Sequence, residues 1–198
     1  MKKVIAALLL STALIFGAGT AQGAEISAAG VENGVCGVTI NFDANGGSGV
    51  MAPLAPSPSA AVTIPANVFT RKNYTFSGWN TRADGKGDAY AQGDDAAPLM
   101  AGAGEGQITL YAQWKINPPT IKSMKSTKPG TLKISYKKIP EAKKYQLQYS
   151  TNKKFPKKNT RTVEIKDVKS SSIEIYDFIP NKTYYVRMSS YDGKTKKF

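Results

Sequence analysis

The alternation of apolar and polar residues predicts short β-strands in the first half of the chain. Residues 38–42 alternate around Ile40 and Phe42, and residues 74–79 form a short aromatic strand. Alternation with a period of two is typical of a strand that is buried on one side. Residues 48–61, rich in Ala, Pro, Gly and Ser, are predicted to form a loop with little to bury. A last strand presents one apolar face, formed by Ile108, Leu110, Ala112 and Trp114.

Alternation returns after residue 130, and it is more regular there. Pro, Gly, Asn and Asp separate the alternating segments, as expected for turns between strands. Several short strands at this spacing favour a β-sandwich. The segments are residues 132–136, 145–149, 163–165 and 173–175.

The net charge changes sign between the two regions of alternating residues. Residues 24–115 hold five basic and eight acidic residues, a net charge of −3, whereas residues 116–198 hold 20 basic and six acidic residues, a net charge of +14. The shift coincides with Asn117-Pro118-Pro119, a short stiff sequence. We therefore predict a first module at residues 38–115, a linker at 116–119 and a second module at 120–198.

The N-terminus predicts export. Lys2 and Lys3 precede an apolar run that extends to about Gly19, and small residues follow, as in a secretory signal peptide. The run is shorter than the roughly 20 residues that a spanning helix needs. Residues 1–24 are therefore predicted to be a signal peptide and 25–37 an N-terminal segment. We expect a secreted or cell-surface protein with no membrane span after cleavage.

The composition disfavours catalysis. The chain has no His and a single Cys, Cys36, which removes Ser/His and Cys/His catalytic pairs, most metal sites and any intrachain disulfide. We predict no enzyme activity, no cofactor and no metal. Cys36 either cross-links two chains or has no particular role.

The first module closely resembles the Listeria–Bacteroides repeat, also called the internalin B-type B repeat. The resemblance rests on INFDANGG, then YTFSGW, then LYAQW, in that order. It implies a β-grasp-like fold found in exported bacterial surface proteins, and it implies no enzyme. On this reading Tyr74, Phe76, Trp79 and Trp114 form a structural core. Two alternatives remain, an aromatic platform for a sugar and a calcium loop built from Asp84, Asp88, Asp94 and Asp95.

The second module resembles a fibronectin type III domain, an immunoglobulin-like sandwich. The resemblance rests on the strands at 132–136 and 145–149 and on Phe178-x-Pro180 before Tyr184-x-Val186-x-Met188. It implies core roles for Tyr136 and Tyr145, and a tyrosine-corner role for Tyr184, whose hydroxyl returns to upstream backbone. Most of strand G is missing, so the domain is predicted to be truncated. We expect that a partner supplies a strand to its open edge, or that the chain is a fragment of a larger protein.

The basic residues of the second module fall into two groups. A strand of about seven residues separates them by roughly 20 Å, at about 3.3 Å per residue. Both groups are candidate contacts for a long polyanion, although a solvated surface kept for solubility is an equal alternative. Near one end lie Lys138, Lys143 and Lys144, with Lys137, Lys194, Lys196 and Lys197, and at the other end lie Lys153, Lys154, Lys157, Lys158 and Arg161.

These observations predict a non-catalytic exported bacterial surface or secreted protein for adhesion or binding. Its expected partners are anionic cell-wall or host glycans, or another surface protein. Nucleic acid is disfavoured, because the chain is exported and shows no known reading motif. The alternative is a structural spacer or stalk fragment of a larger surface protein, with no ligand of its own.

Overall fold

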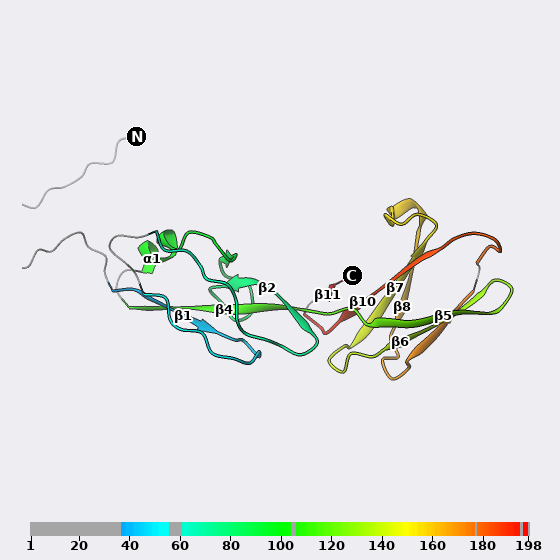
Figure 1. The fold of residues 1–198 in the computed structure, drawn as a ribbon, viewed down its shortest axis with the longest axis horizontal. Coiled ribbons are helices and arrows are strands. Elements are labelled where there is room, and N and C mark those ends of the chain that lie inside the picture. Colours follow the sequence, from blue (N-terminus) through cyan, green and yellow to red (C-terminus); the bar gives the residue numbers. More distant parts are fainter. Residues whose placement is uncertain (1–36, 56–60, 104–105, 177, 195, 198) are drawn as a thin grey trace, which may run out of the picture. The chain divides into compact units, whose positions relative to one another are not determined.

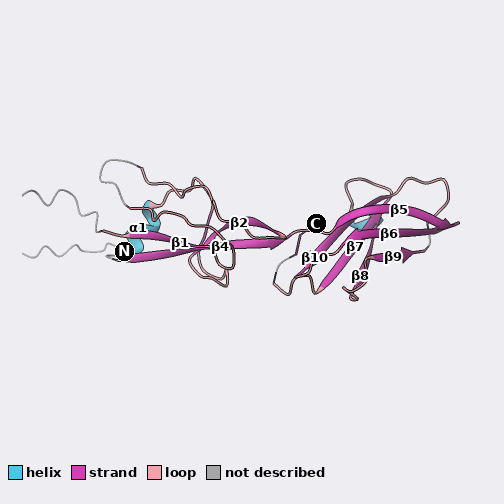
Figure 2. Cartoon of the chain, turned by 60° about the horizontal axis from the view of Figure 1, so that its bottom comes forward, coloured by secondary structure: helices cyan, strands magenta, loops and turns pink. Residues whose placement is uncertain are grey.

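A computed structural model describes residues 37–55, 61–103, 106–176, 178–194 and 196–197. The predicted signal peptide and Cys36 lie outside these residues. Within the described part of the chain, no helix is long and apolar enough to cross a membrane. Figure 1 shows the strands along the chain, and Figure 2 shows how strongly they predominate over helix.

The first module is built on one mixed four-stranded sheet, in the order β1-β4-β2-β3. The first and last long strands run parallel, with Phe42 opposite Leu110, while β2 runs antiparallel to β4. A parallel pair between the first and last strands is what the predicted β-grasp-like fold requires. The strands are β1 (Thr39–Asp43), β2 (Tyr74–Asn80), β3 (Ala89–Tyr90) and β4 (Gln107–Ile116).

Two features of the first module depart from the predicted pattern. Leu54 lies in the segment predicted to bury little, yet its backbone N donates to Ile40 O at 2.8 Å and its side chain packs on the core. A short helix, α1 (Ala97–Ala103), packs Leu99 and Met100 on the same core. Asp95 caps this helix, because its Oδ1 accepts a hydrogen bond from Ala97 N at 2.9 Å. Alternation cannot reveal either feature, since neither is a half-buried strand.

The second module is a sandwich of two antiparallel sheets (Figure 2). One sheet has the order β5-β6-β9 and the other β11-β10-β7-β8, the arrangement expected of a fibronectin type III-like domain. The last strand pairs for only two residues, Lys196 and Lys197, opposite Tyr191 and Ser190. The strands are β5 (Thr120–Lys128), β6 (Thr131–Lys137), β7 (Lys144–Ser150), β8 (Thr160–Ile165), β9 (Ser172–Ile175), β10 (Tyr185–Tyr191) and β11 (Lys196–Lys197), with a 3-10 turn, η1, at Lys157–Asn159.

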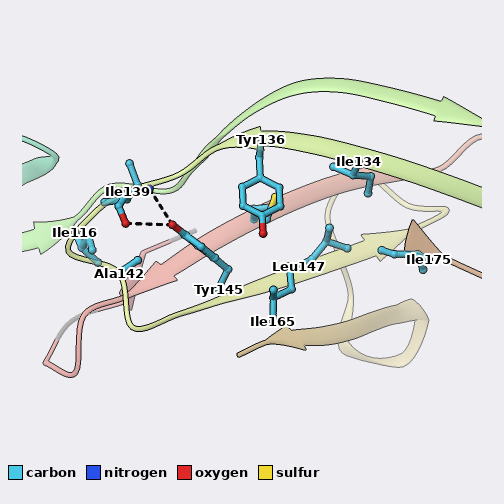
Figure 3. Packing of buried hydrophobic residues seen from close by; sticks show 10 residues of the cluster. Ile116, Ile134, Tyr136, Ile139, Ala142, Tyr145, Leu147, Ile165 and Ile175 are labelled. Atoms are coloured by element: carbon cyan, nitrogen blue, oxygen red, sulfur yellow. Dashed lines mark hydrogen bonds between the residues drawn. The ribbon is translucent and has the colours of Figure 1, made fainter. Parts of the chain in front are cut away.

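Both sheets contribute to the sandwich core (Figure 3). Tyr136 of β6 and Tyr145 of β7 meet edge to face, with ring centroids 5.3 Å apart. The Tyr145 hydroxyl accepts a hydrogen bond from Ile139 N at 2.8 Å and donates to Ile139 O at 3.1 Å. The mainly β fold class, with a fibronectin type III-like second module, is therefore confirmed. The buried members of this core are Ile116, Ile134, Tyr136, Ile139, Ala142, Tyr145, Leu147, Ile165, Ile175 and Met188.

Candidate functional site

The aromatic residues of the first module lie inside it or against its core. Trp79 is 1% exposed and Trp114 7%, while Phe76 is half-buried and contacts both rings edge to face. Trp114 Nε1 donates to Ala44 O at 2.8 Å, and a Cβ at Gly47 would stand 2.8 Å from the Trp114 ring. Buried rings offer no face to a sugar, so these two tryptophans act as framework. Half-buried Tyr74 packs on the same core, with the Arg71 guanidinium 3.9 Å from its ring centroid.

The acidic residues of the first module take part in turn hydrogen bonds. Asp84 pairs with Arg82 at 3.2 Å, and the Arg82 hydrogen bond lowers the pKa of this exposed carboxyl below its usual value. Asp94 accepts a hydrogen bond from Ala91 N at 2.6 Å. Among the residues that the structure describes, no group of three or more Asp, Glu, Cys or His residues could hold a metal ion. The calcium-loop alternative has no geometric support in the described residues.

One end of the sandwich holds its basic residues in local contacts. We call residues 138–144 and 191–194 the paired end, because Lys143 N donates to Tyr191 O at 2.7 Å and joins the two segments. Lys138 Nζ donates to Lys169 O at 2.9 Å. Lys144, at the start of β7, pairs with Glu164 at 2.5 Å and lies 5.0 Å from the Tyr191 ring centroid. The Glu164 hydrogen bond raises the pKa of Lys144 above its usual value.

The loop between β7 and β8, residues 151–159, is shaped by its own hydrogen bonds. Asn152 accepts from Lys154 N at 2.9 Å, and Ser150 Oγ donates to Asn159 O at 2.8 Å. The Arg187 guanidinium lies 4.3 Å from the ring centroid of Phe155, whose φ is 52°. These contacts give the loop a defined shape, so the charges that it carries are presented without a large ordering cost.

The basic side chains of this loop point to solvent and lack acidic partners. No residue from Ser150 to Arg161 is acidic. Among the described residues, no ion pair involves any basic residue of this segment. The segment therefore carries closely spaced positive charges that no acidic side chain neutralises in the described residues. Its exposed basic residues are Lys153, Lys154, Lys157, Lys158 and Arg161.

A groove opens at the same end of the sandwich. It has a volume of about 650 Å³ and lies between the β5–β6 turn and residues 178–184. Phe178 N donates to Gly130 O at 3.1 Å and ties these two segments together. A second hollow, of about 440 Å³, shares Ile179 and Tyr184 with the groove and extends to Arg161. We call residues 126–132, 150–161 and 178–184 together the cationic end.

Tyr184 lies between the two hollows rather than in the central core. Its ring is half-buried and packs edge to face on Phe178, with centroids 4.7 Å apart, and lies 6.3 Å from Tyr149. Its hydroxyl accepts a hydrogen bond from Ile179 N at 3.2 Å, as the tyrosine-corner assignment requires. Sequence reasoning overlooked the two groove lysines, Lys128 and Lys182, because only the folded chain brings them into one groove.

Known proteins resemble the first module in sequence. Residues 39–113 match the family model of the Listeria-Bacteroides repeat domain. This match confirms the resemblance proposed from the FDANGG, YTFSGW and LYAQW motifs. Repeats of this family occur in surface proteins, and such domains are typically non-catalytic.

Two curated relatives come from Evansella cellulosilytica. One is named as a Gly-rich membrane protein, with 38% identity over 81 residues, covering 39% of this chain and 9% of that protein. The other is named as a membrane protein, with 37% identity over 81 residues, covering 39% of this chain and 11% of that protein. The chain thus matches about a tenth of the length of each relative. Among solved structures, the chicken CNTN1 FN1-FN3 domains share 17% identity at a TM-score of 0.34, over 46% of this chain and 30% of that one.

Proposed function

We propose that this chain is a non-catalytic, exported surface or secreted protein whose second module binds anionic polymers. The polymers in question are anionic cell-wall or host glycans. Binding is electrostatic and takes place at residues 150–161, while the first module acts as a spacer or as part of the adhesive surface. The signal-peptide pattern of residues 1–24 and the repeat match at 39–113 support export and surface location.

The uncompensated charge of residues 150–161 carries the proposal. Four basic side chains are exposed on a loop shaped by internal hydrogen bonds and a fifth, Arg161, on β8, and none of them has an acidic partner among the described residues. An exposed cation with no partner keeps its full attraction for an approaching polyanion. Each contact contributes only a few tenths of a kcal/mol, so several must act together.

A salt series tests the proposal. Residues 24–198, without the predicted leader, are passed over immobilised heparin and over teichoic-acid-bearing cell walls at rising ionic strength. A variant carrying Lys153→Gln, Lys154→Gln, Lys157→Gln and Lys158→Gln runs beside the unchanged chain. We expect salt-sensitive retention of the unchanged chain at about 0.15 M and its loss in the variant, because screening shortens the reach of exposed charges.

A matched control separates location from total charge. Lys122, Lys125, Lys133 and Lys137 lie exposed on β5 and β6 of the other sheet. Changing these four to Gln removes the same charge and is expected to leave most of the retention in place. If both variants lose retention equally, the binding is diffuse and the loop is not the site. If the unchanged chain is not retained, the lysines serve solubility and the spacer alternative holds.

A further inference from the structure

The groove at the cationic end differs chemically from the lysine loop beside it. Its lining holds seven apolar side chains, and two of them are strongly exposed, Ile179 at 54% and Met124 at 51%. Exposed apolar side chains that gather around a hollow are typical of a binding groove, whereas singly scattered ones are normal on a protein surface. The remaining apolar wall residues are Pro129, Leu132, Phe178, Pro180 and Val186.

Positive charge surrounds this apolar floor. Lys128 and Lys182 line the groove, and Arg161 lines the hollow that continues from it past Tyr184. None of the described residues that line either hollow is acidic. Among the described residues, none of these three cations forms an ion pair. An occupant must therefore combine an apolar group with negative charge on both sides of it.

We infer that the groove binds an acidic peptide segment of a partner protein, with one large apolar side chain inserted between Met124 and Ile179. The lining favours a peptide over a sugar. A sugar ring carries a hydroxyl on most of its carbons, and each buried hydroxyl needs a hydrogen-bond partner. Against seven apolar side chains the groove offers four neutral polar ones, Ser126, Thr127, Thr131 and Asn181, besides its two lysines and the Tyr184 hydroxyl that accepts from Ile179 N. These are too few for the many hydroxyls of an oligosaccharide.

The groove is formed before any ligand arrives. The Phe178–Gly130 hydrogen bond fixes the distance between its two walls, and Gly130 takes a φ of 73° with no room for a larger residue. A Cβ at Gly130 would stand 3.3 Å from Phe178 O. A preformed site of this kind loses little conformational freedom on binding. The inference goes beyond the proposed binding of polyanions and does not depend on it.

Fluorescence polarisation with two labelled peptides tests the inference. One is a short acidic peptide with a single central phenylalanine, and the other has serine in its place. We expect residues 24–198 to bind the phenylalanine peptide about tenfold or more tightly, the size expected for burying one aromatic side chain. The double variant Met124→Ser and Ile179→Ser should abolish this preference. Because both side chains are more than half exposed, the variant should keep its unfolding midpoint.

Two controls assign the effect to the groove. Val68→Ser removes a comparably exposed side chain, 59% exposed, from the first module and should leave the preference intact. Lys128→Glu with Lys182→Glu should weaken both peptides alike. Equal binding of the two peptides by the unchanged chain would overturn the inference, since charge alone would then explain it. The affinity for a heparin fragment is measured in the Met124/Ile179 variant as well. If it falls as much as the affinity for the phenylalanine peptide, the groove is a glycan site and the inference is overturned. Loss of heparin retention by itself would affect only the proposed function.

Discussion

The two ends of the sandwich carry basic residues in different settings. At the paired end, the Lys138 ammonium group donates to a backbone carbonyl, and that of Lys144 pairs with Glu164. At the cationic end, residues 150–161 hold five exposed cations and no acid. A lysine already engaged with its own chain gains little from a ligand, because it must give up one partner for another. Equal richness in lysine therefore does not mean equal capacity to bind.

The tyrosine hydroxyl groups at the two ends also form different hydrogen bonds. At the paired end, the Tyr145 hydroxyl is buried and engages both backbone groups of Ile139 (Figure 3). At the cationic end, the Tyr184 hydroxyl accepts a single bond from the exposed Ile179 N. The paired end is accordingly the more rigidly built, and substitutions there should affect stability more than binding.

The largest loss of stability is expected from Tyr145→Phe. Both bonds to Ile139 disappear and leave a buried N–H and C=O without partners, which costs about 1–3 kcal/mol of unfolding free energy. Tyr136→Phe is the control, since the buried Tyr136 hydroxyl has no hydrogen-bond partner among the described residues and its loss should leave stability unchanged or higher. Chemical denaturation of both variants checks this. Equal losses would show that the Ile139 contact does not stabilise the paired end.

A smaller loss is expected from Tyr184→Phe at the cationic end. This variant loses one hydrogen bond to an exposed backbone N–H that water can replace, so the cost is about 0.5–1 kcal/mol. The same denaturation experiment measures it beside Tyr145→Phe. A cost as large as that of Tyr145→Phe would remove the difference in rigidity between the two ends.

Alkaline pH should weaken the sandwich through its buried tyrosines. Burial raises the pKa of Tyr136 and of Tyr145 above the ordinary value of 10.0. The folded state therefore favours the neutral phenols, and this stabilisation is complete below pH 10.0 and is lost as the pH rises through the folded-state values. Unfolding midpoints measured across this range should fall, and the fall should be shallower in Tyr136→Phe. If the unfolding midpoint falls equally steeply with pH in Tyr136→Phe and in the unchanged chain, the ionisation of Tyr136 does not contribute to the fall.

The smallest effect is expected from Lys144→Gln. The Lys144–Glu164 pair is largely exposed, with side chains 42% and 40% accessible, so salt screens it. The pairing raises the pKa of Lys144 in the folded state. The slight stabilisation by this ion pair is therefore present below pH 10.5, the ordinary lysine pKa, and is lost as the pH rises through the folded-state pKa. Thermal unfolding at low salt should show a slight decrease that disappears at about 1 M salt. A decrease that persists in salt would indicate a packing role instead.

Local pattern predicted much of this arrangement, and contacts distant in sequence account for the rest. Period-two alternation located most of the long strands, because each has one buried face, but it missed β5, none of whose residues is fully buried. The predicted separation of the two groups of lysines followed from the length of β7. The groove could not be found in this way, since Phe178 and Gly130 meet only through a hydrogen bond between distant segments. Lys128 and Lys182 were overlooked for the same reason. The helix at Ala97–Ala103 was missed because it is short and its cap, Asp95, resembles any turn residue.

The most direct test compares the two ends with equal changes of charge. One variant carries Gln at Lys153 and Lys154, and the other carries Gln at Lys138 and Lys144, whose ammonium groups already contact Lys169 O and Glu164. Heparin affinity of each is measured at constant ionic strength. The account predicts that the first variant loses about threefold, as two contacts of a few tenths of a kcal/mol would give, while the second stays close to the unchanged chain. Equal losses in the two variants would contradict it.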